Sequence, residues 1–569
     1  MNESTTQSQS ACGTPLERLV NRWRQYRPFL SLKAEVEQDR TCDLTISGLA
    51  GSSEAFLLQS LAAETGRPIL VIAERPDEAV DLYDDLVFLM GDTKVGHYPA
   101  RQILPYDFRA PVGEIMGRRI STLDGLSDGR IRVAVTSIRA LMEPAIAVDE
   151  LRGSRIDLRV GSEADPDDLV RRLVRFGFRR VPLVEEVGDF AQRGGLVDFF
   201  TPGSEAPVRV EFFGNDIDTI RQFDVASQRT VGRRDQIQVL PRREVPITHE
   251  TLEKYLEQLP EDDAEYIRGR YLNDPELPGL EWLAVTFGLH KSCLTDHFPE
   301  TGIIYTCGAG SLRLTADDVM AEAAGLRDRL KSRLLSLPQP EQYYFTPDYL
   351  FGRLACHSRI DRVPFRGGNP DTISFGCNSH PALGSRLDLL STEIRKYERS
   401  RVSYFIAVDN EGQGERLREL IADKGDATLA PVIEVASLTG GFVCSDAGVA
   451  VLTDHEIFGR HHRRVRRKKF KEGVAISDYT ALQPGDYVVH TEFGIARYVG
   501  LQTLTVDNRN RDCLLLSYAD NDKLYVPIEE FNRVSKYAGK DSAPQLTRLG
   551  GPGWEKLKEK SKRAIELLA

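Results

Sequence analysis

Short apolar runs alternate with amphipathic stretches through the first 140 residues of the chain. The run Pro68–Ala73 is apolar almost throughout, which is typical of a strand buried on both faces of a parallel sheet. Spacing and capping residues predict the neighbouring elements. These are a strand at Leu44–Ser47, helices at Ala55–Glu64 and Asp77–Met90, a loop at Gly96–Pro111, a strand at Ile131–Thr136 and a helix capped by Ser137. The alternation predicts an α/β layer of the nucleotide-binding type.

The pattern changes near Asp149, where shorter strands separated by glycine-bearing turns replace the long alternation. A helix is predicted near Asp165–Phe176, and strands around Val197–Phe200, Val208–Phe213 and Asp218–Phe223. This predicts a small mixed α+β domain, inserted into the first one.

Two further regions have their own patterns. Around residues 373–465, a buried strand at Val402–Val408, a helix at Gly412–Lys424 and a strand at Gly448–Leu452 predict a small α/β unit. Between Ser477 and Leu546, four short strands joined by tight polar turns predict a small barrel resembling an SH3 domain.

Length and composition fit a multi-domain globular protein. The chain has 569 residues, 41% of them hydrophobic and 28% charged, and no apolar run approaches the roughly 20 residues that span a bilayer. Residues 1–12 are polar and carry no signal-peptide pattern, so we expect a cytoplasmic protein without membrane contact. Eight cysteines lie without Cys-x-x-Cys spacing, and we expect neither a metal site nor a disulfide framework.

A loop with the spacing of a phosphate-binding P-loop follows the first strand. A working loop reads Gly-x-x-x-x-Gly-Lys-Ser/Thr, in which lysine meets the phosphate charge and the hydroxyl holds magnesium. The chain keeps Gly48 and Gly51, but has Ser53, Glu54 and Ala55 at the glycine, lysine and hydroxyl positions. A carboxylate repels a triphosphate, and the nearby sequence offers no cation to replace the lysine. We therefore predict a degenerate loop that binds no nucleotide.

A basic run occupies residues 460–469. It includes six cationic positions that are candidates for nucleic-acid contact: Arg463, Arg464, Arg466, Arg467, Lys468 and Lys469. Such a run is most often a self-repelling linker, although engaged phosphates would give salt-dependent binding without sequence choice. The net charge of −11 disfavours adhesion of the whole surface to nucleic acid. Contact with DNA is therefore expected to be weak or indirect.

Several segments together resemble the amino-terminal half of bacterial transcription-repair coupling factors. In the first half of the chain they are His97–Pro99, Leu104–Asp107, Arg118–Leu123, Arg193–Phe200 and Phe223–Thr230. In the second half they are Val408–Leu417, Thr453–Gly459, Pro484–His490, Gly494–Tyr498 and Lys523–Pro527. The first group is similar to a module that this family shares with the B subunit of the nucleotide-excision-repair nuclease. The degenerate loop fits that comparison.

The resemblance implies a multi-domain α/β architecture with a degenerate RecA/helicase-like domain. Its expected divisions are residues 1–147 with 242–345 for that domain, 148–241 for the inserted α+β domain, and 346–459 for a linker with the small α/β domain. Residues 460–477 are then a basic linker, 478–546 an SH3-like RNA polymerase interaction domain, and 547–569 the start of a helix, from Trp554, that leads to the family's motor.

The resemblance also implies two partners and the residues that contact them. The A subunit of the excision-repair nuclease is expected at Arg193, Arg209 and Phe213 of the inserted domain. The β subunit of RNA polymerase is expected at the barrel, which docks by adding a strand edge, with Leu504, Arg497 and Tyr498 as contacts. Strand period alone leaves Phe213 evenly divided between core and surface, and the resemblance favours the surface. Leucine is most often a core residue, whereas the polar neighbours of Leu504 favour an exposed edge.

No intact nucleotide motif occurs elsewhere in the chain, so we predict a non-enzymatic adaptor of transcription-coupled DNA repair that needs no cofactor. In the resemblance, ATP and magnesium belong to the absent motor, a DNA translocase. Two alternatives remain open. One is an ATP-dependent, helicase-like enzyme that uses the altered loop. The other is a freestanding transcription regulator that acts through the barrel alone.

Overall fold

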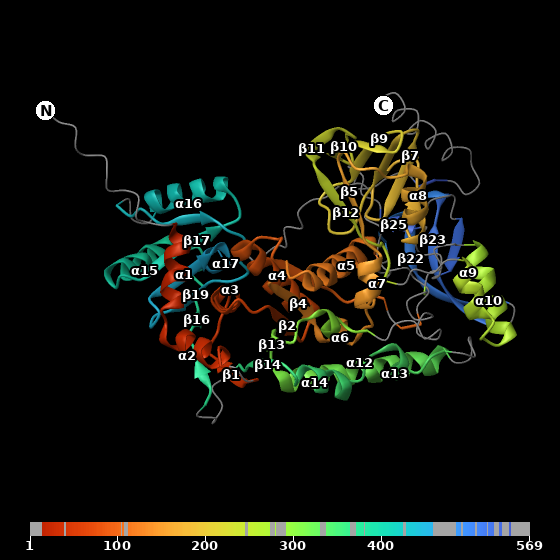
Figure 1. Ribbon diagram of the computed structural model, residues 1–569. Helices are drawn as coiled ribbons and strands as arrows, with labels where there is room; N and C mark the ends of the chain where they lie inside the picture. Colours follow the sequence, from red (N-terminus) through yellow and green to blue (C-terminus); the bar gives the residue numbers. More distant parts are fainter. Residues whose placement is uncertain are drawn as a thin grey trace. The chain divides into compact units, whose positions relative to one another are not determined.

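The structure is a computed structural model, shown in Figure 1. It describes residues 14–38, 41–103, 105–106, 112–244, 249–273, 279, 292–330, 337–364, 371–380, 382–424, 428–458, 485–490, 493–506, 509–519, 522–527, 534–536 and 546–547. The chain divides into two compact units, residues 1–462 and 463–569. Within the described ranges, the first unit contains four sheets and the second contains one.

A seven-stranded parallel sheet forms the centre of the first unit, in the order β15-β1-β14-β13-β2-β4-β3. Strand β2 (Ile69–Ala73) is buried along its whole length, because helices cover both faces of the sheet. The other strands are β1 (Asp43–Ser47), β3 (Val95–Tyr98), β4 (Val133–Ser137), β13 (Ile303–Thr306), β14 (Ser358–Arg362) and β15 (Ile373–Ser374).

Side chains of β2 alternate between two hydrophobic cores. Leu70 and Ile72 belong to one core, whereas Ile69 and Val71 belong to the other. Helices around the first core are α5 (Gly113–Ser127), α6 (Ile138–Met142), α7 (Val148–Gly153), α9 (His249–Leu256), α10 (Glu261–Asn273), α12 (Ala309–Leu330), α13 (Pro340–Tyr343) and α14 (Pro347–Leu354). Helices around the second core are α1 (Pro15–Arg24), α2 (Arg27–Val36), α3 (Ser53–Thr65) and α4 (Pro76–Met90).

The chain between α7 and α9 forms the inserted domain. Its main sheet has six strands in the order β11-β10-β9-β8-β7-β6, and β12 pairs with β5 beside it. Leu169 and Leu173 of helix α8 (Pro166–Arg175) share one hydrophobic core with Val208 and Val210 of β9. The strands are β5 (Ile156–Arg159), β6 (Arg179–Arg180), β7 (Asp189–Arg193), β8 (Leu196–Phe199), β9 (Val208–Phe213), β10 (Asp216–Phe223), β11 (Thr230–Arg234) and β12 (Gln236–Val239).

A buried ion network lies where the chain enters and leaves the inserted domain. Glu143 precedes that domain in sequence and Glu244 follows it. Arg119 of α5 bonds both carboxylates, with Nη1 2.8 Å from Glu143 Oε2 and Nε 2.9 Å from Glu244 Oε1, and Arg101 Nε donates to Glu244 Oε2 at 3.1 Å. These side chains are almost fully buried. Removal of one member would leave another charge unpaired, so the network holds both connections in one arrangement.

The third large sheet of this unit, called the third sheet below, has the order β16-β19-β20-β17-β18. Phe405 and Val451 on one face join the core around α1 to α4, whereas Ile406 and Leu452 on the other face join α15, α16 and α17. The elements are β16 (Asn378–Ser379), α15 (Leu387–Arg399), β17 (Ser403–Val408), α16 (Glu411–Lys424), β18 (Ile433–Val435), β19 (Phe442–Cys444), β20 (Val449–Thr453) and α17 (Asp454–Phe458). The third sheet therefore shares a core with the first.

The second unit is an antiparallel sheet of five strands in the order β24-β23-β22-β21-β25. Val488, Tyr498, Leu514 and Leu516 form its core. The strands are β21 (Tyr487–His490), β22 (Gly494–Val506), β23 (Arg509–Ser517), β24 (Lys523–Pro527) and β25 (Val534–Lys536). The four strands predicted for this region are confirmed.

Most predicted elements are found, with two differences. The predicted loop Gly96–Pro111 begins inside strand β3, which is short and lies at the sheet edge, so its sequence carries little periodicity. Strands β14 and β15 belong to the first sheet, although the predicted division placed both beyond residue 345 in the next region. Parallel pairing joins β1 to strands more than 300 residues later, a relation that local patterns do not reveal.

Candidate functional site

The degenerate loop joins β1 to α3 as a strand–turn–helix. Gly48 and Gly51 have φ angles of 74° and 52°, in the left-handed region that favours glycine. Ser53 Oγ accepts a hydrogen bond from the Ala50 amide at 2.9 Å, so the side chain that replaces the second glycine closes the turn. The backbone thus has the connection of a phosphate-binding loop.

The third sheet's connection Thr439–Gly441 lies directly against this loop. The Ser52 amide donates to the Gly440 carbonyl at 2.9 Å, and a Cβ on Gly51 would lie 2.5 Å from the Gly441 oxygen. A phosphate-binding loop offers such amides to its ligand. Here at least one amide is bonded to the protein itself, and neighbouring backbone touches the loop.

Asp85 of α4 holds this connection in place. Its carboxylate accepts hydrogen bonds from the Thr439 amide at 2.7 Å and the Thr439 hydroxyl at 2.8 Å. Burial raises the pKa of Asp85 to about 7, and the bonds from Thr439 oppose the shift. Local sequence patterns cannot reveal this contact, because Asp85 and Thr439 are 354 residues apart.

Glu54, at the lysine position, is paired rather than isolated. Arg362 at the end of β14 places Nε 3.0 Å from Glu54 Oε1, and the Tyr305 hydroxyl donates to the same oxygen at 2.7 Å. The sequence near the loop offers no cation, but parallel pairing of β14 with β1 brings Arg362 to the site from a distant segment. Arg362 also bonds Glu78 at 2.6 Å, so two carboxylates neutralise its charge. Burial raises the pKa of Glu54, and Arg362 opposes that shift.

On the inserted domain, strand β9 presents Phe213 to solvent. The Phe213 side chain is 83% exposed, whereas Phe212 is 8% exposed and belongs to the domain core. Strand period alone left Phe213 evenly divided between core and surface. In the structure Phe212 faces the core and Phe213 faces outward, which is the side that the resemblance favoured. A partner that covered this ring would bury a large apolar area, so the outer face of β9 is a candidate contact surface.

The two candidate arginines near Phe213 differ in their surroundings. Arg209 forms a bidentate pair with Asp198, with both N–O distances 2.7 Å, and its guanidinium lies 4.8 Å from the Phe223 ring centroid. Arg193 at the end of β7 is exposed and donates to the Pro182 carbonyl. Arg193 and Phe213 are thus open to a partner, whereas most of the Arg209 side chain supports the sheet.

In the second unit, most of strand β22 is paired on one side only. Strand β21 pairs with residues Gly494–Arg497, whereas β23 pairs with β22 as far as Val506. Leu504 lies opposite Arg511 in the part that β21 does not cover. Among the residues the structure describes, this part of β22 therefore offers a free backbone edge, which is the requirement for strand addition.

The other two residues expected at this surface lie on opposite sides of the sheet. Arg497 is exposed and donates from Nε to the Gly485 carbonyl at 3.2 Å. Tyr498 is 4% exposed and packs in the core with Val488 and Leu514. Tyr498 therefore supports the strand from inside, which does not fit a direct surface contact.

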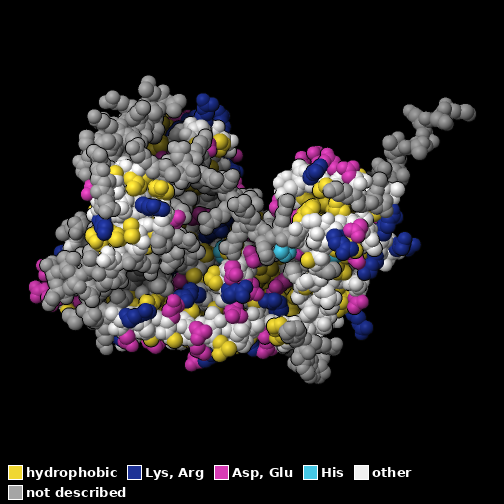
Figure 2. Space-filling view, turned by 180° about the vertical axis from the view of Figure 1, so that it is seen from behind, with side chains coloured by type: hydrophobic (Ala, Val, Ile, Leu, Met, Phe, Trp, Pro, Cys, Tyr) yellow, Lys and Arg dark blue, Asp and Glu magenta, His cyan; other side chains and the backbone are white. Residues whose placement is uncertain are grey.

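The structure shows charges of both signs over the surface. Lysine, arginine, aspartate and glutamate side chains are interspersed over the described part of the face in Figure 2. On α8, Arg171 lies within 3.5 Å of Asp165 and Asp168. The basic run with its six candidate residues, and the predicted helix from Trp554, lie outside the described residues.

Metal-ligand clusters and membrane-spanning helices are both absent from the described residues. No group of three or more His, Cys, Asp or Glu side chains there is arranged to hold a metal ion. In the same part of the chain, no helix is both long enough and apolar enough to cross a membrane.

Comparison with known proteins identifies two domains at these surfaces. Residues 156–244 match the UvrB interaction domain, and residues 482–538 match the CarD-like/TRCF RID domain. Transcription-repair-coupling factors of three bacteria are similar along nearly the whole chain. The Myxococcus xanthus protein is 30% identical over 99% of this chain and 51% of its own length, and the Bacillus subtilis strain 168 and Staphylococcus aureus strain RF122 proteins are 25% identical over 92% and 48%. The chain spans about half the length of these relatives.

Proposed function

We propose that this chain, which is similar to transcription-repair-coupling factors along nearly its whole length, is an adaptor that joins RNA polymerase to the excision-repair nuclease. The observation that carries the proposal is the presence of two interaction-domain matches in one chain, each containing an accessible surface. The exposed ring of Phe213 marks one surface and the free edge of β22 marks the other.

We assign the A subunit of the nuclease to the outer face of β9. Aromatic and arginine side chains dominate the energetics of protein interfaces, and Phe213 would bury most of its ring in a partner. Arg193, exposed at the end of β7 in the same sheet, offers a charged donor fork. Asp198 fixes Arg209 at the opposite position of the neighbouring strand, so Arg209 orders the surface on which Phe213 stands.

We assign the β subunit of RNA polymerase to the free edge of β22. Strand addition takes its affinity from main-chain hydrogen bonds and its specificity from alternate side chains. The segment containing Leu504 meets the geometric requirement, because β21 ends its pairing at Arg497. Arg497 lies at the start of this edge, where an acidic segment of the partner would meet it.

We assign no ATP hydrolysis to the Gly48 loop. Phosphoryl transfer requires a positioned lysine and magnesium ligands, and this loop has Glu54 and Ala55 in those places. The helicase-like alternative requires a cation near the loop. Arg362 lies there, but its guanidinium is already paired with the carboxylates of Glu54 and Glu78.

The nuclease contact is tested by Phe213→Ala in a binding titration with the purified A subunit. We expect a loss of about 30-fold in affinity, which corresponds to ~2 kcal/mol for a buried aromatic anchor. Val231→Ala is the matched control, since Val231 is an exposed apolar residue of the same domain, on β11. Equal binding by the two variants would remove Phe213 as the contact. Absence of binding by the unmodified chain would favour the regulator that acts through the second unit alone.

The polymerase contact is tested by Leu504→Arg in a pull-down with the β subunit. Tyr525→Arg is the control, because Tyr525 is an exposed residue of β24 at an outer edge of the same sheet. We expect the Leu504 variant to lose at least about tenfold in affinity, as for a hot-spot residue, and the Tyr525 variant to bind normally. The reverse pattern would place the partner on β24 and contradict the assignment.

A further inference from the structure

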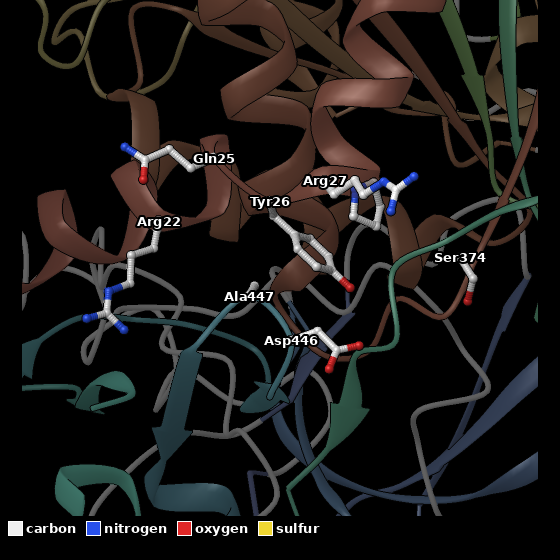
Figure 3. A pocket seen from close by; sticks show the side chains of 8 residues that line it. Arg22, Gln25, Tyr26, Arg27, Ser374, Asp446 and Ala447 are labelled. Atoms are coloured by element: carbon white, nitrogen blue, oxygen red, sulfur yellow. The ribbon is translucent and has the colours of Figure 1, made fainter. Parts of the chain in front are cut away.

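A hollow of about 680 Å³ opens in the first unit, between α1, α2 and the turn after β19. Figure 3 shows Tyr26 between Arg22 and Arg27, with Asp446 and Ala447 on the opposite wall. Tyr26 is itself buried, and its hydroxyl donates to the Phe375 carbonyl at 3.0 Å. Neither of the functions proposed above uses this hollow.

Two cysteine thiols meet at the same carbonyl. Cys444 Sγ lies 3.3 Å from the Phe375 oxygen, and Cys377 Sγ lies 3.7 Å from it. A carbonyl oxygen has two lone pairs, and the Tyr26 hydroxyl is a stronger donor than either thiol. The two thiols therefore compete for one remaining site on this oxygen. If both cysteines lost their S–H groups, the Phe375 carbonyl would still accept the hydrogen bond from the Tyr26 hydroxyl. No strong buried donor would then lack a partner.

The strand register places the two cysteines opposite each other. Strands β16 and β19 are antiparallel, with Asn378 opposite Val443 and Ser379 opposite Phe442, so the next pair in register is Cys377 and Cys444. The Cys377 amide donates to the Gly48 carbonyl at 2.7 Å and not to Cys444. In pairs without mutual hydrogen bonds, the Cα atoms lie about 4.5 Å apart and side chains approach most closely. This separation lies within the range that a disulfide spans.

We propose that Cys377 and Cys444 form a reversible redox pair, which a peroxide oxidises to an intramolecular disulfide. The Cys444 thiolate attacks one oxygen of hydrogen peroxide, the O–O bond breaks, and the products are a sulfenic acid and, after proton uptake, water. The Cys377 thiol then attacks the oxidised sulfur, loses its proton and displaces the oxygen as a second water. Two thiols and one peroxide thus give one disulfide and two waters.

The surroundings favour Cys444 as the attacking group. Its neighbours Cys377, the Ala447 amide and Tyr26 lower the pKa of the Cys444 thiol to about 7, against the effect of burial. Cys377 is 6% exposed and precedes β16, a two-residue strand at the sheet edge. Short edge strands open locally at low cost, which admits a small oxidant or a reductant.

The bridge would have a defined structural effect. Cys377 is bonded to Gly48 of the degenerate loop, and β19 follows the connection that lies against Gly51. A disulfide would therefore join the segment after β15 to the third sheet beside that loop. It would also close a long stretch of chain, which stabilises the folded state.

The experiment treats the full chain with hydrogen peroxide, blocks free thiols with N-ethylmaleimide under denaturing conditions, and maps linked peptides by mass spectrometry. We expect a peptide that links Cys377 to Cys444 in monomeric protein, and its loss after reduction with a phosphine. Cys377→Ser and Cys444→Ser remove the link. Cys356→Ser is the control and retains it, because Cys356 is exposed and lies outside the pair. A second measurement, on the unmodified chain, compares the thermal unfolding midpoints of the oxidised and reduced forms, and the oxidised form is expected to unfold at the higher temperature.

Three results would overturn the proposal. In the first, both cysteines are alkylated after peroxide treatment while Cys356 alone is oxidised. In the second, either cysteine is linked to a different thiol or to a second chain. In the third, the pair is linked but the unfolding midpoint is the same before and after reduction.

Discussion

The degenerate loop and the outer face of β9 use the same kinds of side chain in opposite ways. At the loop, Glu54 and Arg362 face each other, and backbone from a distant segment covers the glycines. On β9, Phe213 projects into solvent, and Arg193 of the same sheet is also exposed. A charge that is already neutralised by a partner inside the protein attracts a ligand only weakly. An exposed aromatic ring, by contrast, is stabilised when a partner covers it. The difference separates a loop whose charges are paired within the protein from a surface that is open to solvent.

The comparison within β9 gives the largest expected effect. Phe212→Ala should destabilise the inserted domain by about 3 kcal/mol, because it opens a cavity in the core. Phe213→Ala should change stability by less than ~0.5 kcal/mol, because the ring is exposed. Urea unfolding of both variants of the full chain measures the difference. Similar losses would show that Phe213 packs within the domain and would weaken its role as a contact.

At the loop, Arg362→Ala should cost about 2 kcal/mol, because Glu54 and Glu78 would lose their shared counter-charge. Arg416→Ala is the matched control, since Arg416 forms an exposed pair with Glu419 and should contribute less than ~0.5 kcal/mol. Chemical denaturation measures both. Recovery of stability in the double variant Arg362→Ala, Glu54→Gln would confirm that the loss comes from the unpaired carboxylate, and no recovery would contradict it.

Asp85 should give the same region a pH dependence of order 1 kcal/mol. The folded pKa of about 7 lies above the usual value, so folding favours the protonated form. The contribution of Asp85 is therefore fully present below about pH 4 and is lost as the pH rises through about 7. The unfolding midpoint of the unmodified chain, measured relative to that of Asp85→Asn, should decrease as the pH rises from about 4 to about 7. A constant difference between the two proteins would count against the raised pKa.

We expect no binding of nucleotide to the Gly48 loop, so this prediction concerns the smallest change. A titration with ATP and magnesium should give no saturable binding up to about 1 mM, a concentration that corresponds to about 4 kcal/mol of binding free energy. The variant Ser53→Gly, Glu54→Lys, Ala55→Thr restores the motif and should also fail, because Gly440 still occupies the Ser52 amide and Arg362 repels the new lysine. Micromolar binding by the unmodified chain would restore the enzyme alternative.

Much of this fold is predictable from local pattern. The apolar run of β2, the amphipathic spacing of α4 and the alternation of β9 all gave the right element, because each buries a face that its own sequence defines. Strand β3 was missed because an edge strand of four residues carries little periodicity. The pairing of β14 and β15 with β1 was missed because parallel neighbours can be any distance apart in sequence.

The candidate site likewise has features that follow from local sequence and features that depend on distant segments. Glu54 at the lysine position was visible in the motif, and its chemistry follows from residue type alone. Arg362 and the covering of Gly51 were not visible, because each depends on a segment more than 300 residues away. The outward orientation of Phe213 also required the structure. Neighbouring residues of a strand face opposite sides, but the strand pattern does not show which side faces the core.

The alternation of elements, the loss of the phosphate-binding residues at Gly48 and the resemblance that implied two partners can all be read from the amino-acid order. The pairing of Glu54 with Arg362, the exposure of Phe213, the burial of Tyr498 and the position of Cys377 opposite Cys444 required the folded chain. Local structure depends on neighbouring residues along the chain, whereas charge pairing and exposure depend on which distant segments the packed cores bring together.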